Sequence, residues 1–462
     1  MDNHLVDNAL RRLIYQKLMY KHEIMPVLKD GFSLENPWDG QVVIIGAGMA
    51  GLTAGYILGK SGIDYTILEA SQVMGGRIRA LEGFADFPVE LGAEEIHGRK
   101  SAWYEMIQKQ ERNIISPEKY GQSLYNIDGK LLTLKEMEAA ELYEQVDKFT
   151  LYWEDYNEED ISVADYLEQL KIPSQYHHVL NAWYGNEYGT SNNRLGVLSM
   201  AQSDNKWSSG ESNFTLKDAS YMEVMKTAFV DVIPNIQFHN QVVMVDYSNE
   251  LVEIETKKGQ YKAKKVIVTV PLSILKAGDL VFFPPLDEEK QQAIDTIGID
   301  HGMKILLKFR TPIWPEKTSS IYPGGKIPEF WVTGLGKDTQ SHVLTGFVNG
   351  ENAEYLSSLG EQAIYVALHE LDQVFGDRKA TANFEDSYII DWGKEPFIKG
   401  AYSYPSLHSE PERISLAEPI DDKVFFAGEA SNAWGHPGTA HGALETGYRA
   451  VKELIESIEL FG

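Results

Sequence analysis

The sequence predicts an α/β fold built on a parallel sheet, and three neighbouring features predict it. Residues 42–45 are four apolar β-branched residues in a row, which is typical of a strand buried on both faces. Glycines with G-x-G-x-x-G spacing follow directly. A helix is expected from about 52 to 60, where Gly62 ends it, and a second strand over 65–68. Strand, glycine turn, helix and strand in this order indicate a Rossmann-like unit.

Each glycine of the turn has a physical reason. Gly46 would make the tight turn out of the strand, Gly48 would let backbone approach a pyrophosphate, and Gly51 would let the helix pack closely on the sheet. The positive N-terminus of the helix would point at the phosphates. Glu69 ends the second strand, where an acid would hydrogen-bond a ribose diol. The sequence therefore predicts a dinucleotide site.

The composition limits what else the protein can be. Its 462 residues are long for one core, so two domains are expected. The net charge of -26 argues against nucleic acid or an anionic membrane as a partner and is compatible with a cationic substrate. The absence of cysteine excludes disulfides, thiolate metal sites and a cysteinyl link to a cofactor. Without a long apolar run or a secretory signal, we expect a cytoplasmic protein with no bound metal.

The remaining chain predicts a second domain inserted into the first. An amphipathic helix is expected over 5–18, and residues 102–226 are expected to be mostly helical. Strands are expected over 236–247, 251–256, 264–270 and 301–309. A strand ending at Gly428-Glu429 and a helix starting near His441 close the chain. We expect an N-terminal helix and linker at 1–40, a discontinuous cofactor domain at 41–98, 222–300 and 385–462, and an α+β substrate domain at 99–221 and 301–384.

A second glycine pair follows the acid and points to the cofactor. Gly75 and Gly76 precede Arg77, whose guanidinium can bind phosphate bidentately. Glu69-Ala70 followed by Gly75-Gly76-Arg77 resembles the FAD-binding opening of the flavin-dependent amine oxidase family. The resemblance runs from 41 to about 454. Its further motifs are most similar to polyamine and spermine oxidases and span 90–93, 96–98, 400–404, 426–430 and 439–444.

The resemblance implies a glutathione-reductase-like FAD-binding domain that holds FAD non-covalently. It implies cofactor contacts from Gly46, Gly48, Ala50, Gly51, Glu69, Gly76, Arg77, Gly92, Ala93, Val242, Gly428, Glu429, Thr439 and Ala440. Lys304 matches the lysine that bonds through a water to flavin N5. Tyr402 matches one wall of an aromatic cage, and Trp392 is expected near the ring. The predicted substrate-binding residues are Glu94, Glu95, His97 and Thr439.

Two departures from the family pattern bear on the substrate. Thr439 stands where monoamine oxidases have the second cage aromatic, which disfavours a simple aryl amine. Glu94-Glu95 occupies the region where many L-amino acid oxidases carry an arginine, and carboxylates there would attract a second ammonium.

The expected reaction is oxidation of a C–N bond of a polyamine to an imine. Hydride passes to flavin N5, O2 is reduced to H2O2, and the imine is hydrolysed. Amine and O2 are the expected partners of a monomer or homodimer. An L-amino acid oxidase, a flavoprotein desaturase or protoporphyrinogen-type oxidase, and a flavin-binding regulatory protein remain as alternatives.

Overall fold

The computed structural model describes residues 21–461. Its first layer is a five-stranded parallel sheet with the order β10-β2-β1-β14-β23. These strands span Ile236–Gln237, Tyr65–Leu68, Val42–Ile45, Lys265–Val268 and Val424–Phe426. All four residues of β1 are buried. The strand at 42–45, the helix after the glycine turn and the strand at 65–68 are thus confirmed.

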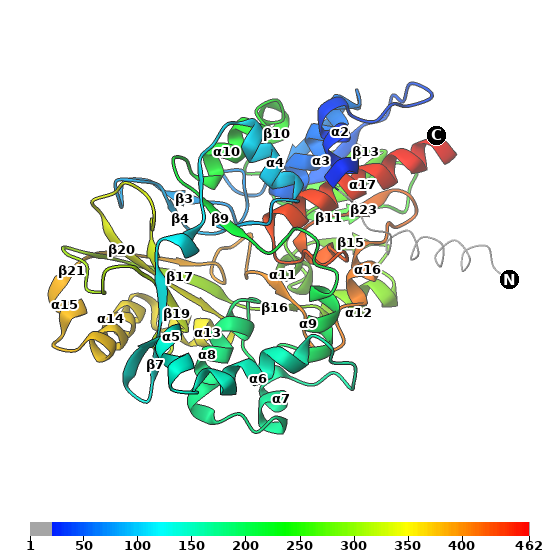
Figure 1. Ribbon diagram of the computed structural model, residues 1–462. Coiled ribbons are helices and arrows are strands. Elements are labelled where there is room, and N and C mark those ends of the chain that lie inside the picture. Colours follow the sequence, from blue (N-terminus) through cyan, green and yellow to red (C-terminus); the bar gives the residue numbers. More distant parts are fainter. Residues whose placement is uncertain (1–20, 462) are drawn as a thin grey trace.

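Helices from the two ends of the chain cover this sheet. The first is α3 (Met49–Lys60), which packs beside the long C-terminal helix α17 (Ala440–Phe461), as Figure 1 shows in blue and red. Together with α2 (Lys21–Asp30) they share one apolar core with the sheet. The α/β fold with a Rossmann-like unit built from the beginning and the end of the chain is confirmed. The predicted helix over 5–18 lies outside the described residues.

A second, four-stranded sheet packs on the other face of the parallel sheet, and it corrects one prediction. Its order is β13-β12-β11-β15, with bounds Gly259–Ala263, Val252–Thr256, Val242–Asp246 and Val281–Phe283. The single strand predicted over 236–247 is wrong, because β10 and β11 belong to different sheets. His239 has φ +56, and backbone bonds from His239 to Ser71 and from Asn240 to Glu69 turn the chain between them.

The third layer is a seven-stranded sheet that carries residues of both halves of the chain. Its order is β21-β17-β20-β19-β18-β7-β8, with bounds Phe384–Asp391, Gly302–Phe309, His342–Asn349, Glu329–Thr333, Thr318–Tyr322, Gln122–Ile127 and Lys130–Thr133. Met303, Ile305 and Leu307 belong to an apolar core shared with α13 (Gly350–Leu359) and α14 (Ala363–Phe375). Side chains alternate along a strand, so Lys304 lies on the opposite face.

The expectation of a mostly helical segment over 102–226 is wrong in part. Strands β7 and β8 lie within it, and β9 (Asn213–Leu216) pairs with β5 (Ile96–His97) and β6 (Ile114–Ile115). β7 pairs with β18, which lies almost 200 residues further along the chain. A local sequence pattern does not indicate with which distant strand a segment will pair. The helices of the segment are Ala102–Lys109, Leu134–Ala139, Tyr143–Trp153, Val163–Gln169, His177–Leu180, Val197–Asp204 and Tyr221–Ala228.

The remaining elements connect these layers. Short strand pairs form between β3 (Ala80–Leu81) and β4 (Val89–Glu90) and between β16 (Gly298–Ile299) and β22 (Ser403–Tyr404). The remaining helices are α11 (Leu272–Lys276), α12 (Glu288–Thr296), α15 (Lys379–Asn383) and α16 (Glu412–Ala417). Over residues 21–461, no helix combines the length and the apolar character needed to span a bilayer.

Candidate functional site

One cavity of about 880 Å³ lies between the parallel sheet and the seven-stranded sheet. Its wall contains every residue predicted to contact cofactor or substrate except Gly51, which is buried beneath the glycine turn. Residues from the ends of β1, β2, β14 and β23 form one part of the wall, and residues of β17 and β19 form another. Ligands of α/β sheets bind outside the carboxyl ends of such strands.

The glycine turn leaves an open backbone cradle on this wall. Gly46 has φ +108, which favours glycine, and a Cβ on Gly51 would lie 2.0 Å from the Gly46 carbonyl oxygen. A Cβ on Gly48 would meet nothing within 4 Å, so the space beside it is open. The Glu69 carboxylate accepts hydrogen bonds from the Ala47 and Ser71 backbone N–H groups, both at 2.8 Å. The cradle at the N-terminus of α3 fits a pyrophosphate.

A buried carboxylate lies at the second glycine-rich part of the wall. Glu429 Oε1 is 2.9 Å from Arg77 Nη1, and Oε2 accepts hydrogen bonds from Ser403 Oγ at 2.5 Å and from the Gly438 N–H at 2.8 Å. Burial alone would raise the pKa of Glu429, but Arg77, Ser403 and the nearby Arg413 outweigh it and hold that pKa below its usual range. The carboxylate is therefore charged and binds Arg77, the residue expected at the phosphates.

Lys304 is buried at the opposite part of the cavity wall. Its Nζ donates to the Glu90 carbonyl oxygen at 3.1 Å and to Glu94 Oε2 at 2.9 Å, and it lies 5.1 Å from the centre of the Trp331 ring. Glu94 therefore forms an ion pair with Lys304 within the protein. Glu94 also lines the cavity, and the role toward a substrate that the sequence predicted for it stays a prediction.

The two predicted aromatic residues lie on the same wall. Trp392 Nε1 donates to the Leu91 carbonyl oxygen at 3.1 Å, and the Arg79 guanidinium lies 5.0 Å from its ring centre. The Tyr402 hydroxyl donates to the Glu187 carbonyl oxygen. Glu187 directly follows a π-helical segment (Asn181–Asn186), which brings it to the cavity.

The carboxyl groups on the cavity wall include three that the sequence interpretation did not single out and that lie close to other predicted site residues. Glu90 is buried and Glu329 is half-buried, whereas Glu187 lies deep among protein atoms with its side chain open to the cavity. Burial, with Glu95 and Glu329 nearby, raises the pKa of Glu187 above its usual range. Burial raises the pKa of Glu329 to about 7 and that of Glu90 to about 8. None of the ion pairs within residues 21–461 involves Glu187 or Glu329.

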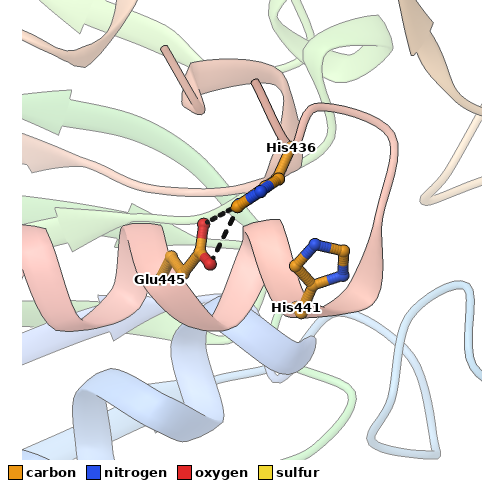
Figure 2. A group of neighbouring side chains, drawn as sticks. All are labelled: His436, His441 and Glu445. Atoms are coloured by element: carbon orange, nitrogen blue, oxygen red, sulfur yellow. Dashed lines mark hydrogen bonds and ion pairs between the residues drawn. The ribbon is translucent and has the colours of Figure 1, made fainter. Parts of the chain in front are cut away.

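His97 lies beside a buried group of three side chains that Figure 2 shows: His436, His441 and Glu445. His436 Nε2 accepts a hydrogen bond from the Ser208 N–H at 3.2 Å, which leaves the proton on Nδ1, where it is donated to Glu445 at 2.9 Å. A metal at either nitrogen would displace one of these bonds. This group therefore serves as a hydrogen-bonded support behind the loop that carries Thr439, whose Oγ1 donates to the His436 carbonyl oxygen.

Comparison with known proteins finds two families along this chain. Residues 44–109 match the model of an NAD(P)-binding Rossmann-like domain, and residues 234–455 match that of the flavin containing amine oxidoreductases. Lysine-specific histone demethylase 2 of Homo sapiens is 26% identical over 477 residues, which cover 96% of this chain and 57% of the relative. Probable polyamine oxidase 4 of Arabidopsis thaliana is 28% identical over 457 residues, with 90% and 87% covered.

The solved structures that resemble the chain agree in fold. A putrescine oxidase bound to putrescine superposes with a TM-score of 0.75 at 17% identity and covers 90% of this chain and 99% of its own. Cyclohexylamine oxidase from Brevibacterium oxydans also gives 0.75 at 17% identity, with 91% and 100% covered. The chain spans 57%, 30% and 52% of the length of the first three demethylase relatives that it matches.

Proposed function

Because this chain belongs to the flavin-containing amine oxidoreductase family, with FAD as its cofactor, we propose that it oxidises a diamine or polyamine at a C–N bond. The product is an imine, which water hydrolyses to an aldehyde and an amine or ammonia. When bound, FAD supplies the electron acceptor for the hydride, and O2 takes the electrons to give H2O2.

The observation that carries this proposal is the pair of carboxyl groups of Glu187 and Glu329. Both line the cavity, neither forms an ion pair within residues 21–461, and enclosure by protein atoms raises the pKa of each. A buried carboxylate is stabilised by an opposite charge at short range, which the distal ammonium of a diamine would bring. The substrate would thus be held by one charged end while its other amine reaches the cofactor.

The alternative of an L-amino acid oxidase requires a cation for the substrate carboxylate. Among the described residues, two arginines and two lysines line the cavity. Lys304 is bound to Glu94, and Lys337 lies over the Phe87 ring, where burial lowers its pKa and disfavours its charged form. Both arginines already bind carboxylates of the protein. Arg77 pairs with Glu429 at 2.9 Å and Arg79 with Glu395 at 2.5 Å. Glu187 and Glu329 would repel an acid group in addition. These pairs favour the polyamine.

The chain's own residues would orient and desolvate the amine. Tyr402 and Trp392 supply apolar wall, and a neutral amine needs no nucleophile from the protein. Lys304, an ammonium on the same wall, would hold a water for hydrolysis of the imine or favour reaction with O2. Gly46, Gly48, Glu69 and the N-terminus of α3 would hold the ADP half of FAD.

The test is a substrate panel with two readouts. Bleaching of the bound flavin is followed without oxygen, and peroxide is measured in air. The panel contains putrescine, spermidine, a monoamine, L-amino acids and an N-methylated lysine peptide, the last because demethylases are among the relatives. We expect the diamine and the triamine to bleach the flavin fastest. Faster bleaching by amino acids or by the peptide would contradict the proposal, and a protein that binds no FAD would end it.

A further inference from the structure

The carboxylate of Glu94 is bound to Lys304 and lies at only 19% exposure of its side chain. The Lys304 side chain is 5% exposed, so the two charges form a nearly buried pair at 2.9 Å. Removing one partner of such a pair leaves the other charge uncompensated in a medium of low polarity. The pair therefore sets the net charge at this part of the wall.

The surroundings of Lys304 leave few other ways to fix its ammonium. One proton is donated to the Glu90 carbonyl oxygen at 3.1 Å, and the Trp331 ring lies 5.1 Å from Nζ. Across β20, Phe347 is paired on one side with Lys304 and on the other with Glu329. The charged groups facing Lys304 are thus Glu90 and Glu94, with Lys337 beyond them and Glu329 two strands away. Of these, only Glu94 makes an ion pair with it.

We propose that Glu94 is the positioning residue and counter-ion of Lys304, holding its ammonium charged and directed along the cavity wall. It is not a ligand for the distal ammonium of the substrate. This inference depends on FAD occupying the cavity and does not depend on which amine is oxidised.

The proposal makes the two single substitutions act in opposite directions on the bound flavin. Glu94→Gln leaves the ammonium without its counter-charge, so the wall becomes positive and the reduced, anionic flavin is favoured. Lys304→Met leaves the carboxylate alone, so the wall becomes negative and the reduced flavin is disfavoured. The double variant restores a neutral wall. Loss of packing alone would not reverse sign between the two.

The experiment measures the midpoint potential of the bound flavin by equilibrium reduction against a reference dye, at one fixed pH. We expect a higher potential in Glu94→Gln, a lower one in Lys304→Met, and a value near that of the native protein in the double variant.

A matched control lies on the same strand. Lys308 pairs with Glu385 at 3.0 Å, and neither residue lines the cavity. Glu385→Gln should leave the potential unchanged. If Glu94→Gln does not retain FAD, the comparison of Lys304→Met with the double variant decides the question, because the double variant should have the higher potential.

The opposite result is equally clear. If Glu94→Gln leaves the potential unchanged but raises KM for putrescine by about tenfold, Glu94 is a substrate ligand and the proposal is wrong. The potentials are measured without any amine. They therefore remain informative if the substrate panel fails, and a failed panel does not overturn them.

Discussion

Glu429 and Glu187 both line the cavity, yet the protein treats the two carboxyl groups in opposite ways. Glu429 is surrounded by partners of its own chain: Arg77, Ser403 and the N–H of Gly438. These partners outweigh burial and lower its pKa. Glu187 has neighbouring carboxylates, Glu95 and Glu329, and burial raises its pKa.

The difference separates two kinds of wall. Near Glu429 the protein supplies the partners itself, because the carboxylate is paired with Arg77 and bonded to Ser403 and to the Gly438 N–H. The wall near Glu187 lacks a positive charge, which a ligand can supply. A permanent cofactor suits the first wall, and a cationic substrate suits the second. The predictions test whether the two walls differ in this way.

The largest effect is expected where one partner of a buried ion pair is removed. Arg77→Ala should lower the free energy of unfolding by about 3 kcal/mol, because it leaves the buried carboxylate of Glu429 without its cation. Arg77→Lys keeps the charge and should retain most of the stability. Urea unfolding at saturating FAD measures both. Adding Glu429→Gln to Arg77→Ala should recover part of the loss, and a further loss would contradict the balanced pair.

The next effect concerns Glu90, a buried carboxyl group that has no ion-pair partner among the described residues. Burial raises the pKa of Glu90 to about 8, so the unfolded chain releases this proton at a lower pH than the folded protein does. The stability of the native protein therefore falls as pH rises from about 4.5 to about 8. Glu90→Gln removes this penalty, while its amide oxygen can still accept the bond from the Tyr221 N–H.

We expect Glu90→Gln to gain on the order of a few kcal/mol of unfolding free energy at pH 8 relative to pH 5. Unfolding in urea at both pH values gives the comparison. An equal change at both pH values would mean that Glu90 is charged in the folded protein.

The glycine cradle for the cofactor could be predicted from the sequence, for a physical reason. The strand at 42–45, the glycine turn and Glu69 lie within 28 consecutive residues, so local geometry fixes their arrangement. The glycines at 46 and 51 are themselves informative, because any side chain at either position would collide with the backbone or be strained. The second wall depends on contacts between distant segments. Glu187 lies near Glu329 because the preceding residue, Asn186, is hydrogen-bonded to Phe347 and Asn349 of β20, and β20 pairs with the strand that carries Glu329. No pattern near either residue indicates this contact.

Glu94 illustrates the same limit within a motif that was identified. The resemblance placed it near the substrate, which its position on the cavity wall allows. Its partner Lys304 is 210 residues away, and the bond between them depends on how β17 lies against the loop after β4. Residue type and spacing predicted that Glu94 lies near the cofactor and substrate. Its ion-pair partner, Lys304, could be identified only from the packed structure.

A third prediction concerns Glu187, which forms no ion pair within the described residues. Glu187→Gln should raise KM for putrescine by about tenfold at pH 8.5, a loss of about 1.4 kcal/mol, with little change in kcat. The loss should shrink at pH 6, because the native carboxyl is then protonated and attracts an ammonium less. A monoamine measured at each pH corrects for deprotonation of the reacting amine. Equal losses for the diamine and the monoamine would contradict a role in binding the second ammonium.

The smallest effect on substrate binding is expected behind the wall near Glu429, where a hydrogen bond within the protein is changed and no ligand charge is involved. Glu445→Gln keeps the shape of the side chain but removes the negative charge that receives the His436 Nδ1 proton at 2.9 Å. A charge-assisted bond of this kind contributes about 1–2 kcal/mol, so the free energy of unfolding should fall by that amount. Glu445 does not line the cavity, so KM for putrescine should stay within about twofold. A large rise in KM would show that the support fixes the substrate wall as well, and the two walls would then not be independent.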